Sequence, residues 1–204
     1  YWDNAYVIHH LYEDNQVEIP DIISECEKAG NPNLVYEFAS TSKVSFPGSG
    51  IAAMAASAEN LADVKKQMTI QTIGYDKLNQ LRHVAYFKNI DGLKAHMKKH
   101  ADAMRPKFEA VLKVLDEELT GAEIGSWVKP LGGYFISFDA MEGCAKKIVA
   151  KCKEAGVTLT NAGATFPYGK DPKDSNIRIA PSFPTPEEMA VATDLFVLCV
   201  KLVS

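Results

Sequence analysis

The feature that most constrains the fold is an apolar, strand-like segment that runs without a break into a short polar sequence. Residues 34–39 read Leu-Val-Tyr-Glu-Phe-Ala, whose β-branched and aromatic side chains are typical of a buried strand. Residues 40–43 read Ser-Thr-Ser-Lys, and residues 46–50 then read Phe-Pro-Gly-Ser-Gly, the composition of a tight loop. The chain therefore places a lysine, Lys43, just beyond the end of a strand.

Lys43 is a candidate functional residue because of this position. An ammonium group is costly to remove from water, so a lysine at the end of a buried strand is rarely there without a reason. Imine chemistry uses a lysine amine as its nucleophile. The hydroxyls of Ser40 and Ser42, with the N–H groups of the loop, could donate to a phosphate. The spacing alone also fits an ordinary surface loop.

The first ninety residues alternate between strand and helix patterns. We expect a short buried strand at 5–9, a helix at 20–29 that Gly30 ends, and the strand at 34–39. A segment of small residues at 51–57 precedes a helix at 60–68. Such alternation predicts an α/β sheet.

The second half begins with a long helix, predicted over about 92–119. Its apolar stripe is Leu93, Met97, Met104, Phe108, Val111 and Leu115, and Pro106 is expected to kink it. We then expect a strand over 127–138, a helix over 144–155 and short strands at 157–160 and 176–180. A closing helix over 185–203 has the capping-box pattern of Thr185 and Glu188. This predicts two parts, residues 1–90 and a small α+β domain with its linking helix over 91–204.

Composition narrows the class of protein only slightly. The 204 residues are 47% hydrophobic and carry a formal net charge of −4, which gives no case for nucleic acid or an anionic membrane. No apolar run approaches the roughly 20 residues of a membrane helix, and no signal peptide is visible. Four scattered cysteines suggest free thiols in the cytoplasm. Because Tyr1 is not methionine, we expect a fragment of a longer protein.

Three motifs in order carry a resemblance to a known family. Residues 40–43 with Phe46-Pro47-Gly48 look like the cofactor-lysine motif of fold-type-I aminotransferases, which use pyridoxal 5'-phosphate (PLP). Residues 3–6, Asp-Asn-Ala-Tyr, resemble the strand before that motif, and residues 176–182 resemble the strand with the carboxylate-binding arginine. Residues 78–83 and 162–169 look like an aspartate aminotransferase subgroup. The resemblance covers essentially the whole chain and implies the C-terminal half of such an enzyme.

The resemblance implies a role for each matching residue. Lys43 would hold PLP as a Schiff base and later move a proton between the substrate α-carbon and the cofactor. Asp3 would pair with the pyridine nitrogen, and Tyr6 would bond the phenolic oxygen. Ser40 and Ser42 would contact the phosphate. Arg178 would bind the substrate α-carboxylate as a two-pronged fork, which lysine could not mimic.

Two departures from the family pattern matter. Many of these enzymes have a phosphate-binding arginine shortly after the lysine, and alignment of Pro47-Gly48 puts Gly50 at that position. In the family, the ring that stacks on PLP and part of the phosphate site lie N-terminal to Asp3, so this chain alone should bind PLP poorly. A second arginine for a dicarboxylic substrate could be Arg82 or Arg105, or lie elsewhere in the protein.

The resemblance favours a transaminase that moves an amino group between an amino acid and a 2-oxo acid by ping-pong chemistry, possibly aspartate and 2-oxoglutarate. It also implies a homodimer. Another PLP reaction, β-elimination or decarboxylation, stays open, as does an aminotransferase-like domain of a transcription regulator.

Other patterns, and ordinary structural roles for the same residues, compete with this interpretation. Asp3 could be a cap, Tyr6 a core residue, Ser40 and Ser42 loop caps, and Arg178 an ion-pair partner. Ser-Thr-Ser-Lys also fits the Ser-x-x-Lys of penicillin-binding enzymes, but no Lys-Thr-Gly follows. His96 and His100 have the spacing of a metal pair, yet two lysines beside them favour a solvated face, and we predict no metal site.

Overall fold

The computed structural model describes residues 1–204, which form two compact units. Unit 1 consists of Tyr1–His10 and Gln16–Lys99, and unit 2 consists of Leu11–Asn15 and His100–Ser204. Each unit contains its own three-stranded sheet. The assignment of residues 1–90 to a cofactor-binding portion stays a prediction.

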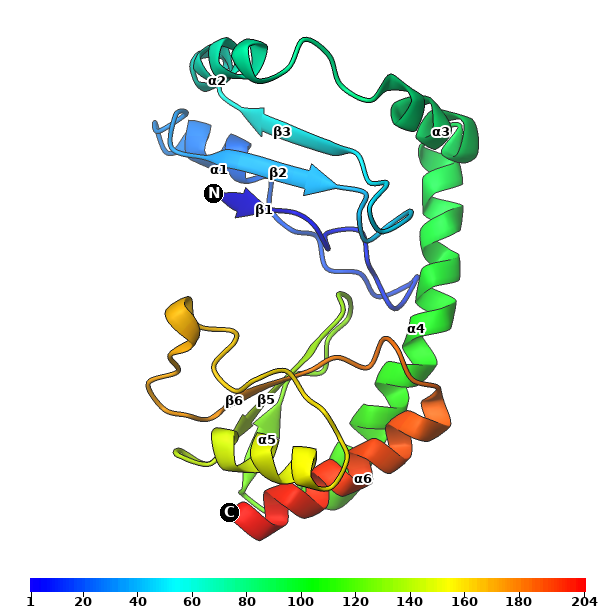
Figure 1. Cartoon of the computed structure of the whole chain (residues 1–204), viewed down its shortest axis with the longest axis vertical. Coiled ribbons are helices and arrows are strands. Elements are labelled where there is room, and N and C mark those ends of the chain that lie inside the picture. The colour runs from blue at the N-terminus through cyan, green and yellow to red at the C-terminus, as the bar shows by residue number, and fades with distance from the viewer. The chain divides into compact units, whose positions relative to one another are not determined.

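Unit 1 is built on a three-stranded sheet in the order β1 (Trp2–Asp3), β2 (Tyr36–Ser40) and β3 (Ala52–Ala56) (Figure 1). β1 runs parallel to β2, with Asp3 opposite Phe38, and β3 runs antiparallel to β2, with Ala52 opposite Ser40. The helices of this unit are α1 (Ile22–Lys28), α2 (Ala58–Gln71) and α3 (Lys77–Phe87). Helix and strand content of this kind confirms the predicted α/β class.

Two expectations for unit 1 need correction. The strand predicted at residues 5–9 is wrong, because these residues form a turn and the strand lies earlier, at Trp2–Asp3. Local bonds occupy the backbone donors there: Ala5 N donates to Asp3 Oδ1 (3.0 Å) and His9 N donates to Tyr6 O (3.0 Å). Helix α3 was not predicted from the sequence. Its segment has no clear apolar stripe, and Leu78 and Leu81 are exposed in the structure.

Helix α4 (Ile90–Leu119) is the long helix that the apolar stripe predicts, and it continues through Pro106. From His100 onward the helix belongs to unit 2, where it supplies core residues at helical spacing. Phe108, Val111 and Leu115 are fully buried. They pack in one cluster with residues of the second sheet and of the C-terminal helix, including Phe138, Ile177, Phe196 and Val200.

Unit 2 contains an antiparallel sheet in the order β4 (Gly125–Trp127), β5 (Ile136–Ala140) and β6 (Asn176–Ile179). Its helices are α5 (Ala145–Glu154), the short η1 (Pro167–Gly169) and α6 (Pro186–Val203). The single strand predicted at 127–138 is wrong: β4 and β5 are two strands, and Gly132 and Gly133 lie in their connection. Residues 157–160, predicted as a strand, form none.

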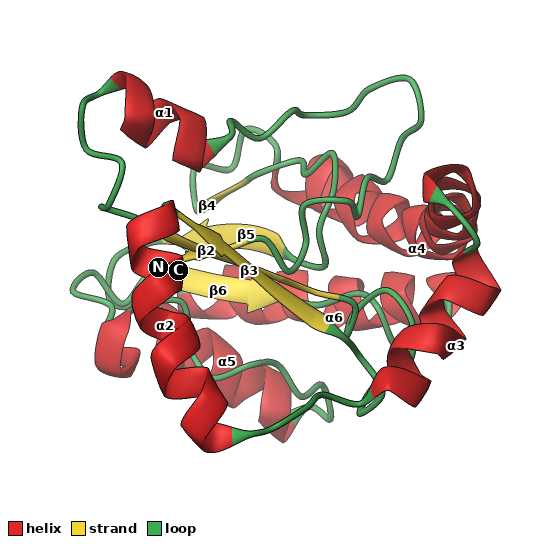
Figure 2. Ribbon diagram, turned by 90° about the horizontal axis from the view of Figure 1, so that it is seen from above, coloured by secondary structure: helices red, strands yellow, loops and turns green.

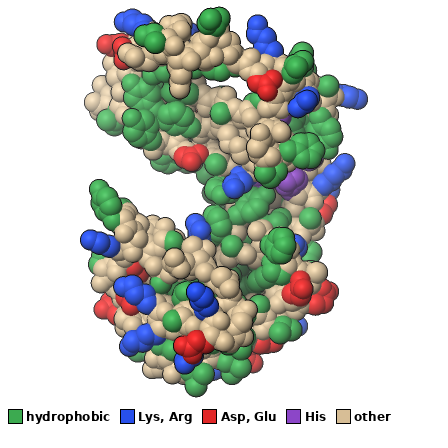
Figure 3. Space-filling view, in the orientation of Figure 1, with side chains coloured by type: hydrophobic (Ala, Val, Ile, Leu, Met, Phe, Trp, Pro, Cys, Tyr) green, Lys and Arg blue, Asp and Glu red, His purple; other side chains and the backbone are tan.

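The end of the chain agrees with its local sequence signals. Thr185 N donates to Glu188 Oε2 (2.8 Å), and Glu188 N donates to Thr185 Oγ1 (3.2 Å), so the predicted capping box is confirmed. Apolar side chains also remain on the surface, as the space-filling view shows (Figure 3). No helix combines the length and the apolar character needed to cross a bilayer.

Candidate active site

The loop of residues 41–51 joins β2 to β3, two strands of the unit 1 sheet that are labelled in Figure 2. Lys43 in this loop is exposed. Its first residues form one tight turn, in which the N–H groups of Val44 (2.9 Å) and Ser45 (2.8 Å) both donate to Thr41 O. The turn separates the side chains into two sets. Val44 is 2% exposed and faces inward, whereas Ser42 and Lys43 are exposed.

Two histidines hold the backbone of this turn from the inner side. His9 Nε2 lies 3.0 Å from Lys43 O, and His96 Nε2 lies 2.8 Å from Val44 O. Since a carbonyl oxygen only accepts, each of these ring nitrogens carries the proton and donates. Burial lowers the pKa of His9 below its ordinary value of 6.5, and the neighbouring charges of His10 and Lys43 act in the same direction.

A third histidine, His83 on α3, contacts the hydroxyls on either side of Lys43. Its Nε2 lies 2.9 Å from Thr41 Oγ1 and 2.8 Å from Ser45 Oγ, while its Nδ1 lies 2.8 Å from the carbonyl oxygen of Asn79. Asn79 itself reaches the far end of the loop, where its Nδ2 donates to Ser49 O (2.8 Å). Both side chains are more than nine-tenths buried.

The predicted cofactor residues Asp3, Ser40, Ser42 and Lys43 lie at one edge of the unit 1 sheet. Asp3 ends β1, and Ser40 ends β2. Because these strands are parallel, their carboxyl ends meet at the same edge, the usual place for a ligand in an α/β sheet. The bond from Ala5 N fixes one oxygen of the exposed Asp3 carboxylate.

Tyr6 follows in the turn after β1. It is half-buried, and its ring packs edge-on against His9 with the ring centroids 5.8 Å apart. The side chain thus lies beside one of the histidines that hold the Lys43 turn.

Gly50 is the position at which the family pattern led us to expect an arginine, and the loop leaves no room for a side chain there. A Cβ atom at Gly50 would lie 2.5 Å from Ser42 Oγ and 2.9 Å from Ser42 N. Both distances are shorter than a carbon atom tolerates, and one of the atoms is backbone. Ser42 therefore occupies the space that the Cβ of an arginine at position 50 would need.

Arg178 lies in unit 2, on β6 opposite Ser137 of β5. Its guanidinium carbon is 4.4 Å from the centre of the Phe135 ring, and one terminal nitrogen donates weakly to Thr160 Oγ1 at 3.4 Å. Its Nε is buried and has no hydrogen-bond partner within the chain. A buried guanidinium N–H without an acceptor is costly, which indicates a place for an anionic ligand.

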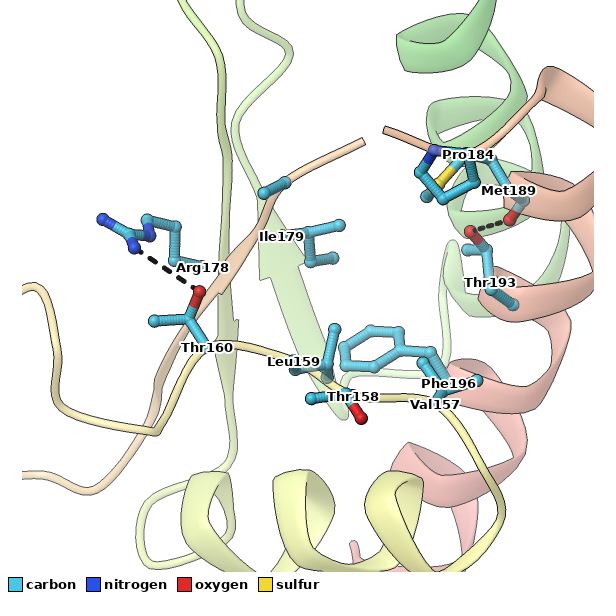
Figure 4. A pocket seen from close by; sticks show the side chains of 12 residues that line it. Val157, Thr158, Leu159, Thr160, Arg178, Ile179, Pro184, Met189, Thr193 and Phe196 are labelled. Atoms are coloured by element: carbon cyan, nitrogen blue, oxygen red, sulfur yellow. Dashed lines mark hydrogen bonds between the residues drawn. The ribbon is translucent and has the colours of Figure 1, made fainter. Parts of the chain in front are cut away.

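Figure 4 shows Arg178 and Ile179 on opposite faces of β6. Ile179 points toward a cavity of about 170 Å³ lined mainly by apolar side chains of α6 and of residues 157–160. Arg178 and Thr160 also line this cavity, and the guanidinium of Arg178 points toward Thr160. The backbone before β6 is fixed by Asp171, whose Oδ2 accepts from the N–H groups of Ser175 and Asn176, each at 2.8 Å.

The sequence did not indicate the three histidines as parts of one cluster. They come from positions 9, 83 and 96, and only the fold brings them to the same turn. His96 suggested at most a metal pair with His100, whereas its Nε2 donates to Val44 O. Asn79 and His83 are four residues apart, which places them on the same face of a helix. The sequence could have paired them only if α3 had been predicted as a helix.

Comparisons with known proteins identify the family of the chain. The family model described as aspartate aminotransferase matches residues 1–204. The chain belongs to the aspartate aminotransferase family. An aspartate aminotransferase from Corynebacterium glutamicum is 44% identical over 201 residues, which are 98% of this chain and 46% of that protein.

Solved structures of aminotransferases share the fold. An aspartate transaminase from Corynebacterium glutamicum superimposes with a TM-score of 0.95 at 44% identity, over 99% of this chain and 47% of that one. An alpha-aminoadipate aminotransferase from Thermus thermophilus, complexed with a phosphopyridoxyl-leucine, gives a TM-score of 0.78 at 22% identity over 98% of this chain and 49% of that one. The fold is thus part of fold type I of the PLP-dependent transferases. The chain spans about half the length of these relatives.

Proposed function

We propose that the protein to which this chain belongs is a PLP-dependent aminotransferase in which Lys43 holds the cofactor. The observation that carries the proposal is the placement of Lys43 on an exposed turn at the carboxyl end of β2, next to the carboxyl end of the parallel strand that ends in Asp3. Membership of the aspartate aminotransferase family supports the same chemistry.

The residues of unit 1 fit PLP on their donor chemistry. An exposed primary amine, a carboxylate fixed by a backbone N–H, and two serines are the groups that an aldehyde, a pyridine nitrogen and a phosphate require. They are supplied by Lys43, Asp3, Ser40 and Ser42. When bound, PLP supplies an electron sink that stabilises negative charge at the substrate α-carbon.

Each residue then has a separate task. Lys43 Nζ would hold the cofactor through its aldehyde and, when its amine is free, would take up the proton from the substrate α-carbon. The Asp3 carboxylate would pair with the protonated pyridine nitrogen. The Tyr6 hydroxyl would donate to the phenolic oxygen, and Ser40 and Ser42 would donate to the phosphate.

Arg178 binds the α-carboxylate of the substrate. Its buried Nε lacks an acceptor in the chain, and a guanidinium can donate two parallel bonds to a carboxylate. The Phe135 ring beside it supports the guanidinium plane. Loss of this fork should weaken substrate binding more than loss of a single charge would.

The charge on the phosphate needs a partner other than residue 50, because that position cannot carry a side chain without displacing Ser42. We propose that the rest of the protein or a second subunit supplies it. A homodimer is proposed for the same reason. The substrates are an amino acid and a 2-oxo acid, with aspartate and 2-oxoglutarate as first candidates, and the proposed location is the cytoplasm.

The full-length protein with PLP tests the reaction type. Each of a panel of amino acids is mixed with 2-oxoglutarate, and both products are quantified. The proposal predicts equal amounts of glutamate and of the 2-oxo acid derived from the donor, with ping-pong kinetics. Release of ammonia, as in β-elimination, or of carbon dioxide without amino transfer would contradict it in favour of the alternative PLP reactions.

A further inference from the structure

We propose that His83 is a positioning residue for Lys43: it fixes the hydroxyls of Thr41 and Ser45, and with Asn79 it holds both ends of the loop that carries the lysine. This inference rests on the proposed function. It deepens that function by naming the residues of α3 that prepare the site before the cofactor arrives.

The contacts of His83 lie symmetrically about Lys43. Thr41 precedes the lysine by two residues and Ser45 follows it by two, and both hydroxyl oxygens lie within 2.9 Å of Nε2. Nδ1 carries the proton, because its partner is the carbonyl oxygen of Asn79. In this tautomer Nε2 is an acceptor with one lone pair, so one of the two hydroxyls donates to it while both oxygens stay within its reach.

The hydroxyl of Thr41 transmits this constraint to the base of the loop. Thr41 Oγ1 accepts from Ile51 N (2.9 Å), and Thr41 N donates to Ile51 O (2.8 Å). The side chain of Thr41 thus ties the start of the loop to its end. Ser45 Oγ also lies 3.1 Å from Thr41 O, so both hydroxyls bound to His83 belong to the turn itself.

Asn79 closes the other side of the loop. Its Nδ2 lies 2.8 Å from Ser49 O and 3.3 Å from Gly50 O. Asn79 and His83 are one helical turn apart on the buried face of α3, so a single rigid helix holds residues 41, 45, 49 and 50. None of these contacts uses Ser42 or Lys43, which keep the outer face.

These contacts preorganise the loop that carries Lys43. A loop that already holds its lysine in place loses little conformational entropy when a ligand binds. A short loop with three glycine or proline residues would otherwise be free to move. In this protein the contacts from α3 order the loop. An arginine at position 50 cannot do so, because that position has no room for a side chain.

The test compares His83→Asn with His83→Gln in the full-length protein. Asparagine can keep the bond to the Asn79 carbonyl but cannot reach the two hydroxyls. Glutamine can reach the hydroxyls at the place of Nε2. The matched control is Gln80→Ala, an exposed residue of the same helix.

Two readouts are measured after circular dichroism has shown that each variant is folded. The first is hydrogen exchange of residues 41–51 without PLP. The second is the rate at which borohydride traps PLP on Lys43, followed by peptide mass. We expect His83→Asn to exchange faster in this loop and to slow trapping about five- to tenfold, the loss of one or two buried hydrogen bonds. His83→Gln should recover part of both, and Gln80→Ala should match the wild type.

Unchanged loop exchange and unchanged trapping in a folded His83→Asn variant would overturn the positioning role. If both histidine variants unfold, Asn79→Ser takes their place, with exchange at residues 49–51 as the readout and wild-type exchange there as the contradicting result. A wild-type protein that never traps PLP on Lys43 would instead refute the proposed function. In that case the exchange experiment still decides whether His83 orders the loop.

Discussion

The Nε2 atom of His83 lies 2.9 Å from the hydroxyl oxygen of Thr41, two residues before the lysine that the sequence marks as functional. His9 and His96 contact the next backbone carbonyls, those of Lys43 and Val44. Three histidines from distant parts of the sequence therefore surround one turn. Their common effect is to bury one side of the turn and leave Lys43 on the other.

Gly50→Ala should weaken PLP binding. The new Cβ would lie 2.5 Å from Ser42 Oγ and 2.9 Å from Ser42 N, so the loop must shift. Overpacking of this kind costs about 1–3 kcal/mol, which corresponds to roughly 5- to 150-fold in the dissociation constant of PLP if the whole cost falls on the bound state. Equilibrium titration of the full-length protein measures it. Gly74→Ala, at a position with open space, is the control.

Gly50→Arg tests the same geometry from the opposite direction. If position 50 lacked only a positive charge for the phosphate, the new arginine would make this variant bind PLP more tightly than the wild type. The close approach of Ser42 predicts weaker binding. A gain in affinity would contradict the account of this loop.

Arg178→Lys should raise the KM for the amino acid donor by roughly 10- to 100-fold, because lysine offers a point charge in place of two parallel donors. Steady-state kinetics with the best donor checks it, and the affinity for PLP should not change. Thr160→Val removes only the weak 3.4 Å contact and should alter KM little. Equal KM values for Arg178→Lys and the wild type would remove Arg178 from the substrate site.

The stability of the protein should fall as the pH drops below 6.5, in part through His9. Its folded-state pKa is lowered by burial, so the unfolded chain binds a proton first and protonation favours unfolding. His9→Gln can keep a donor for Lys43 O but does not titrate. Melting temperatures from pH 8 to pH 5 should therefore converge for the two proteins as the pH falls, whereas a widening gap would refute this sign.

Asp171 should stabilise the start of β6 as long as its carboxyl is ionised, and should cease to do so in acid. Backbone donors at Asn176 and Ser175 hold the pKa of its carboxyl below the ordinary value of 3.8. This stabilisation is present above that value and is lost as the pH falls through the lower folded pKa. Asp171→Asn should melt at a lower temperature than the wild type at pH 7, and the difference should shrink near pH 3. Glu154→Gln, in an exposed ion pair, should show neither effect.

Local signals in the sequence were sufficient for several elements. The strand before Ser40, the stripe on α4 and the capping box of α6 each follow from a pattern within one segment. The strand expected at 5–9 failed because turn bonds involving Asp3 and Tyr6 occupy the local donors. The long strand expected at 127–138 failed because apolar content says little about where a chain reverses.

The residues of the candidate site also differ in whether the sequence alone could identify them. Lys43, Asp3 and Arg178 were identified from motifs, since each stands in a short stretch that resembles the family. His83 was not, because its function depends on contacts 38 and 42 residues away in the chain. Likewise, the glycine at position 50 was evident from the sequence, but its closeness to Ser42 follows only from the folded loop.

The most direct test of the central claim is reduction of the full-length protein with borohydride in the presence of PLP, followed by peptide mass mapping. The account predicts a phosphopyridoxyl group on the peptide that contains Lys43 and on no other lysine. An unmodified Lys43 in a folded protein, or a label on a different lysine, would contradict it.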